Sequence, residues 1–208
     1  EIISMADVPS GTGLGSSSCY LIGLLNALHT LKRDFVSLQD LAEEACTIEL
    51  DILKKPIGKQ DQYMAAFGGL TTLDISKTGK VTVGTVNVRR AVIDDLEKNM
   101  LIFFTGAMRN ALDILAGQNK ATEQKDKTVV GSLSRIKEIG YRIKEAIETG
   151  NLTRFGQLMD EHWEHKKKLS AKVSDRRFDA LYDLAKKHGA LGGKLTGAGG
   201  GGFFVFYC

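Results

Sequence analysis

The ten residues from Pro9 to Ser18, PSGTGLGSSS, constrain the fold of this chain more than any other stretch. Gly11, Gly13 and Gly15 recur at every second position, and glycine adopts backbone conformations with positive φ that other residues avoid. Such a loop can turn several backbone N–H groups toward one point. An apolar pattern with helical spacing follows, so the serines open a helix whose first N–H groups lack partners. This combination predicts an anion site, and phosphate is the anion that suits it best.

Two common phosphate-binding motifs do not fit this loop. A P-loop requires a lysine after its last glycine, and there is none between Gly11 and Ser18. A dinucleotide-binding fingerprint has the spacing GxGxxG, with an acidic residue after a second strand about 20 residues later. Here the spacing is GxGxG, and the helical pattern continues to Arg33-Asp34. The simplest alternative is a glycine-rich turn whose serines cap the helix.

The composition limits the class of protein. The chain has 208 residues, of which 43% are hydrophobic and 25% charged, which is typical of a soluble globular protein. The net charge of +3 is small and the longest basic run is Lys166–Lys168, so we expect no nucleic-acid partner. No apolar run approaches the roughly 20 residues of a membrane span. Three widely spaced cysteines, Cys19, Cys46 and Cys208, indicate free thiols, and we predict a cytoplasmic protein.

Both ends of the sequence are unusual for natural termini. Glu1 is not an initiator methionine, and the stretch 1–8 has the composition of a strand that leads into the glycine loop. Residues 203–208, FFVFYC, form strands readily and then stop. Termini are more often polar and exposed. We therefore expect a protein truncated at both ends.

The order of predicted elements is typical of an α+β protein in two parts, with the break near residues 87–99. In the first part we expect a largely buried helix over 17–32 and a second helix that starts at the capping sequence Ser37-x-x-Asp40 and ends near 49–51. A Pro/Gly-interrupted loop at 55–63 then leads into a short helix ending at Phe67. A β-hairpin over 70–75 and 80–88 completes the first part. In the second part the pattern predicts these elements: a buried strand over 100–105, a helix over 109–115, a mobile loop over 117–127, helices over 128–149, 152–170 and 175–188, and a glycine loop over 197–202 before a final strand.

Two further features are candidates for chemistry. Glu49 at a helix end and Asp61 in the loop 55–63 could bind a metal ion and orient an attacking hydroxyl. The four consecutive glycines 199–202 precede apolar residues and indicate backbone packed closely against a ligand or another strand. The pair His162-x-x-His165 has no third ligand in view, and we expect it on a solvated helix face. Arg109 could contact a substrate phosphate.

Taken together, these motifs resemble the GHMP kinase superfamily, which includes galactokinase, homoserine kinase and mevalonate kinase. The stretch 9–18 is similar to the superfamily's second motif, PxxxGLGSSA, with Ser18 where alanine is usual; the stretch 194–202, KLTGAGGGG, is similar to its third. The first motif has no counterpart here. Stretches 56–63, 105–109 and 192–204 most resemble bacterial D-glycero-D-manno-heptose phosphate kinases, with the kinase part of fucokinases next.

The resemblance implies a two-domain α+β fold. An ATP-binding domain over 1–90 would be of the ribosomal S5 domain 2-like type, and a ferredoxin-like domain would cover 91–208. It implies ATP and Mg²⁺ as cofactors, Ser17 and Glu49 as metal ligands and Asp61 as the base or orienting group. It also implies a nucleotide-binding set: Pro9, Ser10, Gly11, Thr12, Gly13, Leu14, Gly15, Ser16, Ser17, Gly197, Ala198, Gly199 and Gly200.

The activity that the resemblance implies is ATP-dependent phosphorylation of a sugar hydroxyl. The acceptor we expect is the anomeric position of D-glycero-D-manno-heptose 7-phosphate. Two alternatives stay open: a fucokinase- or galactokinase-like kinase, and a non-catalytic regulator that binds sugar and nucleotide. The only partner expected is a small sugar or sugar phosphate, and the protein would be a monomer or a homodimer.

Overall fold

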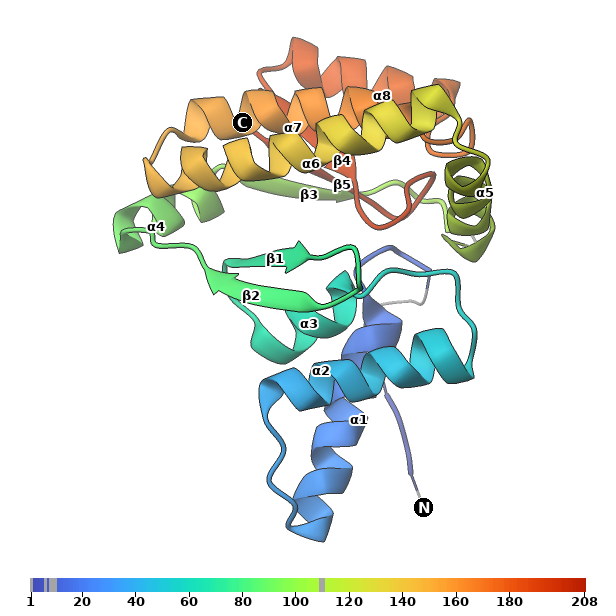
Figure 1. The fold of residues 1–208 in the computed structure, drawn as a ribbon. Coiled ribbons are helices and arrows are strands. Elements are labelled where there is room, and N and C mark those ends of the chain that lie inside the picture. The colour runs from blue at the N-terminus through green and yellow to red at the C-terminus, as the bar shows by residue number, and fades with distance from the viewer. Residues whose placement is uncertain (1, 6, 8–10, 109–110) are drawn as a thin grey trace.

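The computed structural model describes residues 2–5, 7, 11–108 and 111–208. The first part of the chain is mainly helical. It comprises α1 (Ser16–Lys32), α2 (Leu38–Cys46), the π-helix η1 (Thr47–Ile52), α3 (Gln60–Phe67) and an antiparallel hairpin of β1 (Thr71–Ile75) and β2 (Val81–Thr85). The hairpin lies between the helices α1–α3 and the rest of the molecule (Figure 1). The helices pack through Ile22, Leu25, Leu41 and Ala45.

The segment that joins α2 to the following loop places the first acidic candidate inside the protein. Ser37 caps α2 as expected, because its Oγ accepts a hydrogen bond from the Asp40 N–H at 3.1 Å. The helical segment continues past Cys46 as η1 and ends at Ile52, close to the predicted end near 49–51. π-Helical turns are frequent at functional sites. Glu49 lies in η1 with only 1% of its surface exposed.

The second part of the chain is built on a three-stranded antiparallel sheet. Its elements are α4 (Arg90–Lys98), β3 (Met100–Phe104), α5 (Ala111–Glu123), α6 (Lys127–Glu148), α7 (Leu152–Lys167), α8 (Arg176–Lys187), β4 (Gly192–Leu195) and β5 (Phe203–Tyr207). β5 lies between β3 and β4. The helices α6, α7 and α8 form a layer beside this sheet (Figure 1). The core between them contains Trp163, Phe178, Leu195 and Phe204.

The α+β class is confirmed, but several element predictions are wrong. The described residues of segment 1–8 form no strand. The helix over 17–32 is present but is not largely buried: Leu28 and Leu31 are 37% and 79% exposed. The segment 117–127, expected as a mobile loop, is helical up to Glu123, because α5 continues through its polar residues.

The strands of the second part also differ from expectation. The strand predicted over 100–105 was expected to be buried, yet Leu101 to Phe104 are all exposed because β3 is an edge strand of the sheet. β4 was not predicted, since its sequence GGKL contains two glycines and a lysine. The described part of the chain has no helix that is long and apolar enough to span a membrane. The division at residue 90 stays a prediction; α4 begins at that residue.

Close packing of α7 on β4 fixes the position of the strand that precedes the second glycine loop. A Cβ on Gly192 would lie 2.0 Å from the Gly156 carbonyl oxygen and 2.6 Å from the Asp160 nitrogen. Tyr182 supports the same region: its hydroxyl donates to Asp160 Oδ1 at 2.6 Å and accepts from the Gly193 N–H at 3.2 Å. The helix and the strand can therefore approach this closely only because both contribute glycine.

We expect Gly192→Ala to lower the free energy of unfolding by about 1–3 kcal/mol, because overpacking backbone against backbone forces α7 away from β4. Chemical denaturation followed by circular dichroism measures this. Gly140→Ala is the matched control: a Cβ on this helical glycine would have nothing within 4 Å, and alanine there should stabilise α6 by up to about 1 kcal/mol. Equal effects of the two substitutions would contradict the packing argument.

Candidate functional site

Two glycine loops from opposite ends of the chain meet at one place. We call residues 11–15 the first glycine loop and residues 196–202 the second glycine loop. The second connects β4 to β5 and points toward the N-terminal helices (Figure 1). The Thr196 hydroxyl donates a hydrogen bond to the Thr12 carbonyl oxygen at 3.2 Å. Thr12 is 1% exposed and Thr196 is half-buried, so the contact is largely shielded from water.

The contact between the loops consists of backbone against backbone. A Cβ on Gly202 would lie 2.0 Å from the Thr12 carbonyl oxygen, and one on Gly13 would lie 2.9 Å from the Thr196 carbonyl oxygen. Both glycines also have positive φ, 83° and 78°. No other residue type meets both demands. The glycine spacing seen in the sequence is thus needed for the two loops to meet.

The N-terminus of α1 opens beside this contact. Gly15 is its N-cap with φ 72°, and no side chain caps the helix. Side chains cap four other helices, α2, α6, α7 and α8, through Ser37, Asp126, Asn151 and Asp175. Helices α3 and α4, like α1, have no side-chain cap. An uncapped helix end leaves backbone N–H groups and the positive end of the helix dipole available to an anion.

Glu49 is surrounded by hydrogen-bond donors. Its Oε1 accepts from Ser17 Oγ at 2.8 Å and from Lys55 Nζ at 2.8 Å. Its Oε2 accepts from Ser18 Oγ at 2.7 Å and from Gln62 Nε2 at 2.5 Å. Burial acts to raise the pKa of this carboxyl, but the four donors lower it below its usual value of 4.5. Glu49 is therefore held as a carboxylate.

The other acidic residues near Glu49 in sequence have different partners. Glu43 binds Lys59 and the Tyr63 hydroxyl, and Glu44 lies 2.8 Å from His29 Nε2. Asp51 is exposed. Of these carboxylates, Glu49 is the one that the structure places against Ser17.

Asp61 lies against the first glycine loop. It is in the first turn of α3 rather than in the loop where the sequence placed it, and its Cγ is 3.5 Å from where a Cβ on Gly15 would lie. Burial raises the pKa of Asp61, while a hydrogen bond from Gln60 and the charge of Lys194 act to lower it. The structure thus brings a half-buried carboxylate beside the uncapped end of α1.

Lysines of the second part approach the site from the other side. Lys166, on α7, is buried and its Nζ donates to the carbonyl oxygens of Leu195, at 3.3 Å, and Gly197. Burial lowers the pKa of Lys166 well below its usual value, and it also lowers that of Lys194, which Asp61 acts to raise. Lys166 thus fixes the start of the second glycine loop.

The histidine pair is not on a solvated face, which corrects the expectation from sequence. His162 and His165 are half-buried on α7, and burial together with Lys194 and Lys166 lowers the pKa of His162 to about 3. His162 is therefore neutral at physiological pH. Among the described residues no cluster of three or more His, Cys, Asp or Glu side chains could hold a metal ion.

The structure gathers most of the residues that the sequence singled out. The two glycine loops, Ser17, Glu49 and Asp61 lie around one region, whereas Pro9, Ser10 and Arg109 fall outside the described residues. Five of the described residues at the site were missed: Ser18, which replaces the usual alanine of the motif, and Lys55, Gln62, Lys166 and Lys194. The sequence offered a signal for two of them: Lys55 and Gln62 belong to the segment 55–63 that contains Asp61.

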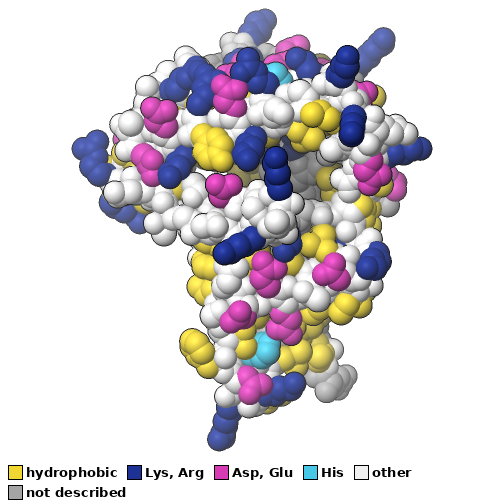
Figure 2. Space-filling model, in the orientation of Figure 1, with side chains coloured by type: hydrophobic (Ala, Val, Ile, Leu, Met, Phe, Trp, Pro, Cys, Tyr) yellow, Lys and Arg dark blue, Asp and Glu magenta, His cyan; other side chains and the backbone are white. Residues whose placement is uncertain are grey.

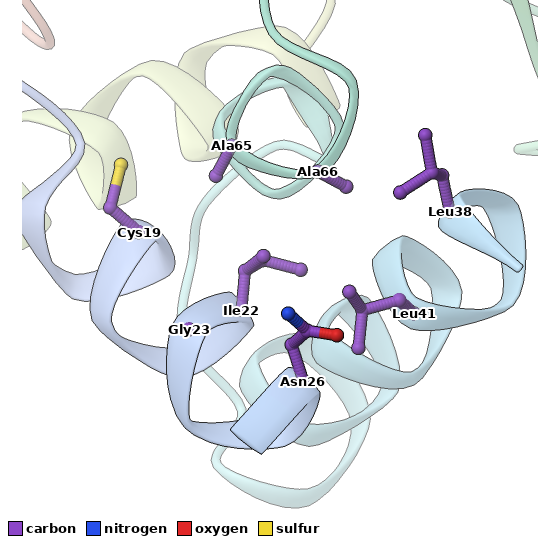
Figure 3. Close-up of a pocket in the computed structure, with 8 residues that line it drawn as sticks. All are labelled: Cys19, Ile22, Gly23, Asn26, Leu38, Leu41, Ala65 and Ala66. Atoms are coloured by element: carbon purple, nitrogen blue, oxygen red, sulfur yellow. The ribbon is translucent and has the colours of Figure 1, made fainter. Parts of the chain in front are cut away.

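A hollow elsewhere on the first part has a different character. It lies between α1, α2 and α3 and measures about 300 Å³. Figure 3 shows its lining: Cys19, Ile22, Gly23, Asn26, Leu38, Leu41, Ala65 and Ala66. No charged side chain lines it, so it does not suit a phosphate.

On the face shown in Figure 2, basic and acidic side chains are interspersed rather than separated into a single basic stripe.

Comparison with known families matches both parts of the chain. The family model of the GHMP kinases N terminal domain matches residues 1–69, and that of the GHMP kinases C terminal domain matches residues 143–208. Together they account for more than half of the chain. The first match contains the first glycine loop, Ser17, Glu49 and Asp61; the second contains Lys166 and the second glycine loop.

Individual relatives include proteins named as sugar kinases and others named as mevalonate kinases. A D-glycero-alpha-D-manno-heptose 7-phosphate kinase from Campylobacter jejuni is 32% identical over 97% of this chain and 59% of its own length. An L-fucokinase/L-fucose-1-P guanylyltransferase from Bacteroides fragilis is 32% identical over 98% of this chain and 21% of its own length. The crystal structure of a D-glycero-D-manno-heptose 1-phosphate kinase from Bacteroides thetaiotaomicron matches with a TM-score of 0.72 and 28% identity, over 97% of this chain and 54% of that one. The chain thus spans little more than half of these heptose kinases.

The Glu49 network predicts a pH dependence of stability. The folded-state pKa of Glu49 lies below its usual value of 4.5. The stabilisation that its ionised carboxylate gives to the fold is therefore complete above pH 4.5, and it is lost as the pH falls through the folded-state pKa. We expect Glu49→Gln to lower the free energy of unfolding by about 1–3 kcal/mol at pH 7, and by less at pH 3. Urea titrations of both proteins at the two pH values test this, and an equal loss at both would contradict it.

Proposed function

Because the chain belongs to the GHMP kinase family, we propose that its protein transfers a phosphoryl group from ATP to a hydroxyl of a small sugar. The observation that supports this most directly is the position of Asp61. Its carboxylate lies against the first glycine loop, within the same group of residues as the Glu49–Ser17 pair. In this proposal these residues would supply a phosphate site, cation ligands and a proton acceptor close together, which is the set that phosphoryl transfer needs.

The nucleotide would be held mainly by backbone. The uncapped N-terminus of α1 and the first glycine loop supply N–H groups for the phosphates, with the second glycine loop on the other side. The proposed contacts are those of residues 9–17 and 197–200. Lys166 keeps the second loop in place through its bonds to Leu195 and Gly197. ATP fits this arrangement as the phosphate donor.

The residues present fit a Mg²⁺ ion bound together with the nucleotide. Mg²⁺ in nucleotide sites commonly takes one or two protein oxygens and completes its shell with phosphates and water. Glu49 Oε1 and Ser17 Oγ offer such a pair. In the structure the Lys55 ammonium donates hydrogen bonds to both of these oxygens and so takes the place of a cation there. When bound, Mg²⁺ would neutralise charge on the transferred phosphoryl group.

Asp61 would act on the acceptor hydroxyl. Its raised pKa strengthens it as a base, while Lys194 favours the ionised form that can accept a proton. From this position Asp61 would orient the hydroxyl toward the γ-phosphate and take its proton. The new O–P bond would form as the bond from the γ-phosphorus to the β–γ bridging oxygen breaks and ADP leaves. Most of the remaining catalysis would come from positioning the two substrates.

We propose a heptose phosphate as the acceptor, phosphorylated at its anomeric hydroxyl, on the basis of the two heptose kinase relatives. Fucose is the second candidate, favoured by the fucokinase relative. A phosphorylation screen of the full-length protein with ATP and heptose 7-phosphate, fucose, galactose and mannose discriminates them, with the phosphate position determined by NMR. Preference for fucose or galactose would overturn the heptose assignment, and nucleotide binding with no turnover on any sugar would favour a regulator.

We expect Asp61→Ala to reduce turnover by about 100- to 10,000-fold, the usual contribution of a positioned acid or base. Nucleotide binding should remain measurable, since Asp61 does not hold the phosphates. A coupled assay for ADP gives the rate, and calorimetry gives nucleotide affinity. The control is Asp51→Ala, which removes an exposed carboxylate of η1 and should leave the rate near that of the wild type. Near-normal turnover of Asp61→Ala would remove this residue from the mechanism.

A further inference from the structure

One lysine donates hydrogen bonds to both of the oxygens that are proposed to bind the cation. Lys55 Nζ is 2.8 Å from Glu49 Oε1 and 3.0 Å from Ser17 Oγ, and these two oxygens are themselves 2.8 Å apart. An ammonium group and a metal ion both seek such oxygen lone pairs, and they cannot bind the same ones at once. Lys55 thus occupies the position that a divalent cation would take.

The surroundings of Glu49 leave one side open to an incoming ion. Oε2 faces inward, where Ser18 and Gln62 cover it, and both of these residues are buried. Oε1 faces Ser17, which is exposed, and Lys55, whose side chain is 28% exposed against 1% for Glu49. A cation that approaches from solvent therefore meets Lys55 first.

The local backbone aims Lys55 at this position. Its N–H donates to the Glu49 carbonyl oxygen at 2.9 Å, closing the wide turn at the end of η1. Lys54 has φ 52°, an uncommon conformation for a non-glycine residue, which reverses the chain there. Pro56 follows and restricts the backbone of Lys55 to extended conformations. The ion pair is thus built into the end of η1.

We infer that the Lys55 ammonium holds the cation position of the Glu49–Ser17 pair in the nucleotide-free protein, and that a divalent cation binds only by displacing it. This rests on the proposed function. The physical reason for such a stand-in is that a buried carboxylate without a counter-charge is costly. Lys55 supplies that charge before the nucleotide arrives. The consequence is competition, so that Lys55 weakens the binding of the metal.

The test measures Mn²⁺ binding by electron paramagnetic resonance in the full-length protein saturated with a non-hydrolysable ATP analogue. We expect Lys55→Met to tighten Mn²⁺ binding by about fivefold, the equivalent of one partly exposed ion pair. Lys54→Met is the matched control, because it removes the same charge from the neighbouring exposed residue. It should change the affinity less than about twofold, as expected for a screened surface charge. Lys55→Gln keeps a polar side chain and should tighten Mn²⁺ binding as Lys55→Met does. It replaces Lys55→Met in the test if that variant does not fold.

The outcomes separate this inference from the proposed function. Weaker Mn²⁺ binding in Lys55→Met and Lys55→Gln would mean that Lys55 assists the metal–nucleotide complex, and would overturn the inference. A Mn²⁺ affinity of the Lys55 variants equal to that of Lys54→Met would also overturn the inference. In both cases the wild type still binds Mn²⁺ and the kinase proposal stands. If the wild type binds no Mn²⁺ with the nucleotide analogue, the proposed cation site fails and the inference fails with it.

Discussion

The close approach of two backbones is the interaction on which the rest of this site depends. The first glycine loop begins the chain's first helix and the second precedes its last strand, almost the whole sequence apart. They meet with Gly13 against Thr196 and Gly202 against Thr12, at distances that leave no room for a Cβ. A side chain at either glycine would separate the loops. The carboxylates of one part would then lose their position relative to the lysines of the other.

Acidic side chains lie on one side of this contact and lysines on the other. Glu49 and Asp61 come from η1 and α3, whereas Lys166 and Lys194 come from α7 and β4. Each group is buried enough for its pKa to be shifted: burial raises that of Asp61 and lowers those of both lysines. Glu49 differs, because its donors outweigh its burial. The net shifts of the two carboxyl pKa values are thus opposite: hydrogen bonding prevails at Glu49 and desolvation at Asp61, in line with the different roles proposed for them.

Where local pattern and structure disagree, the cause is the neighbourhood of each element. The apolar residues of α1 follow helical spacing, but only one stripe of them contacts α2 and α3, so Leu31 stays exposed. The apolar composition of β3 predicted burial, yet the strand lies at the sheet edge. The polar segment 117–127 is predominantly helical because α5 continues into it. The spacing of His162 and His165 gave no sign that α7 packs against β4 and buries them in part.

The sequence by itself determined the α+β class, most of the helices, the hairpin and the two glycine loops. These depend on local chemistry: periodicity, capping and the backbone freedom of glycine are properties of short segments. Resemblance to the GHMP kinases added Ser17 as a candidate and gave Glu49 and Asp61 their proposed roles. Only the tertiary structure decided that the loops touch, and that Glu49 rather than Glu43, Glu44 or Asp51 faces Ser17. It also brought Lys55 and Lys166 into the site. Those contacts depend on the wide turn of η1 and on the packing of α7 against β4, which join residues that no sequence spacing relates.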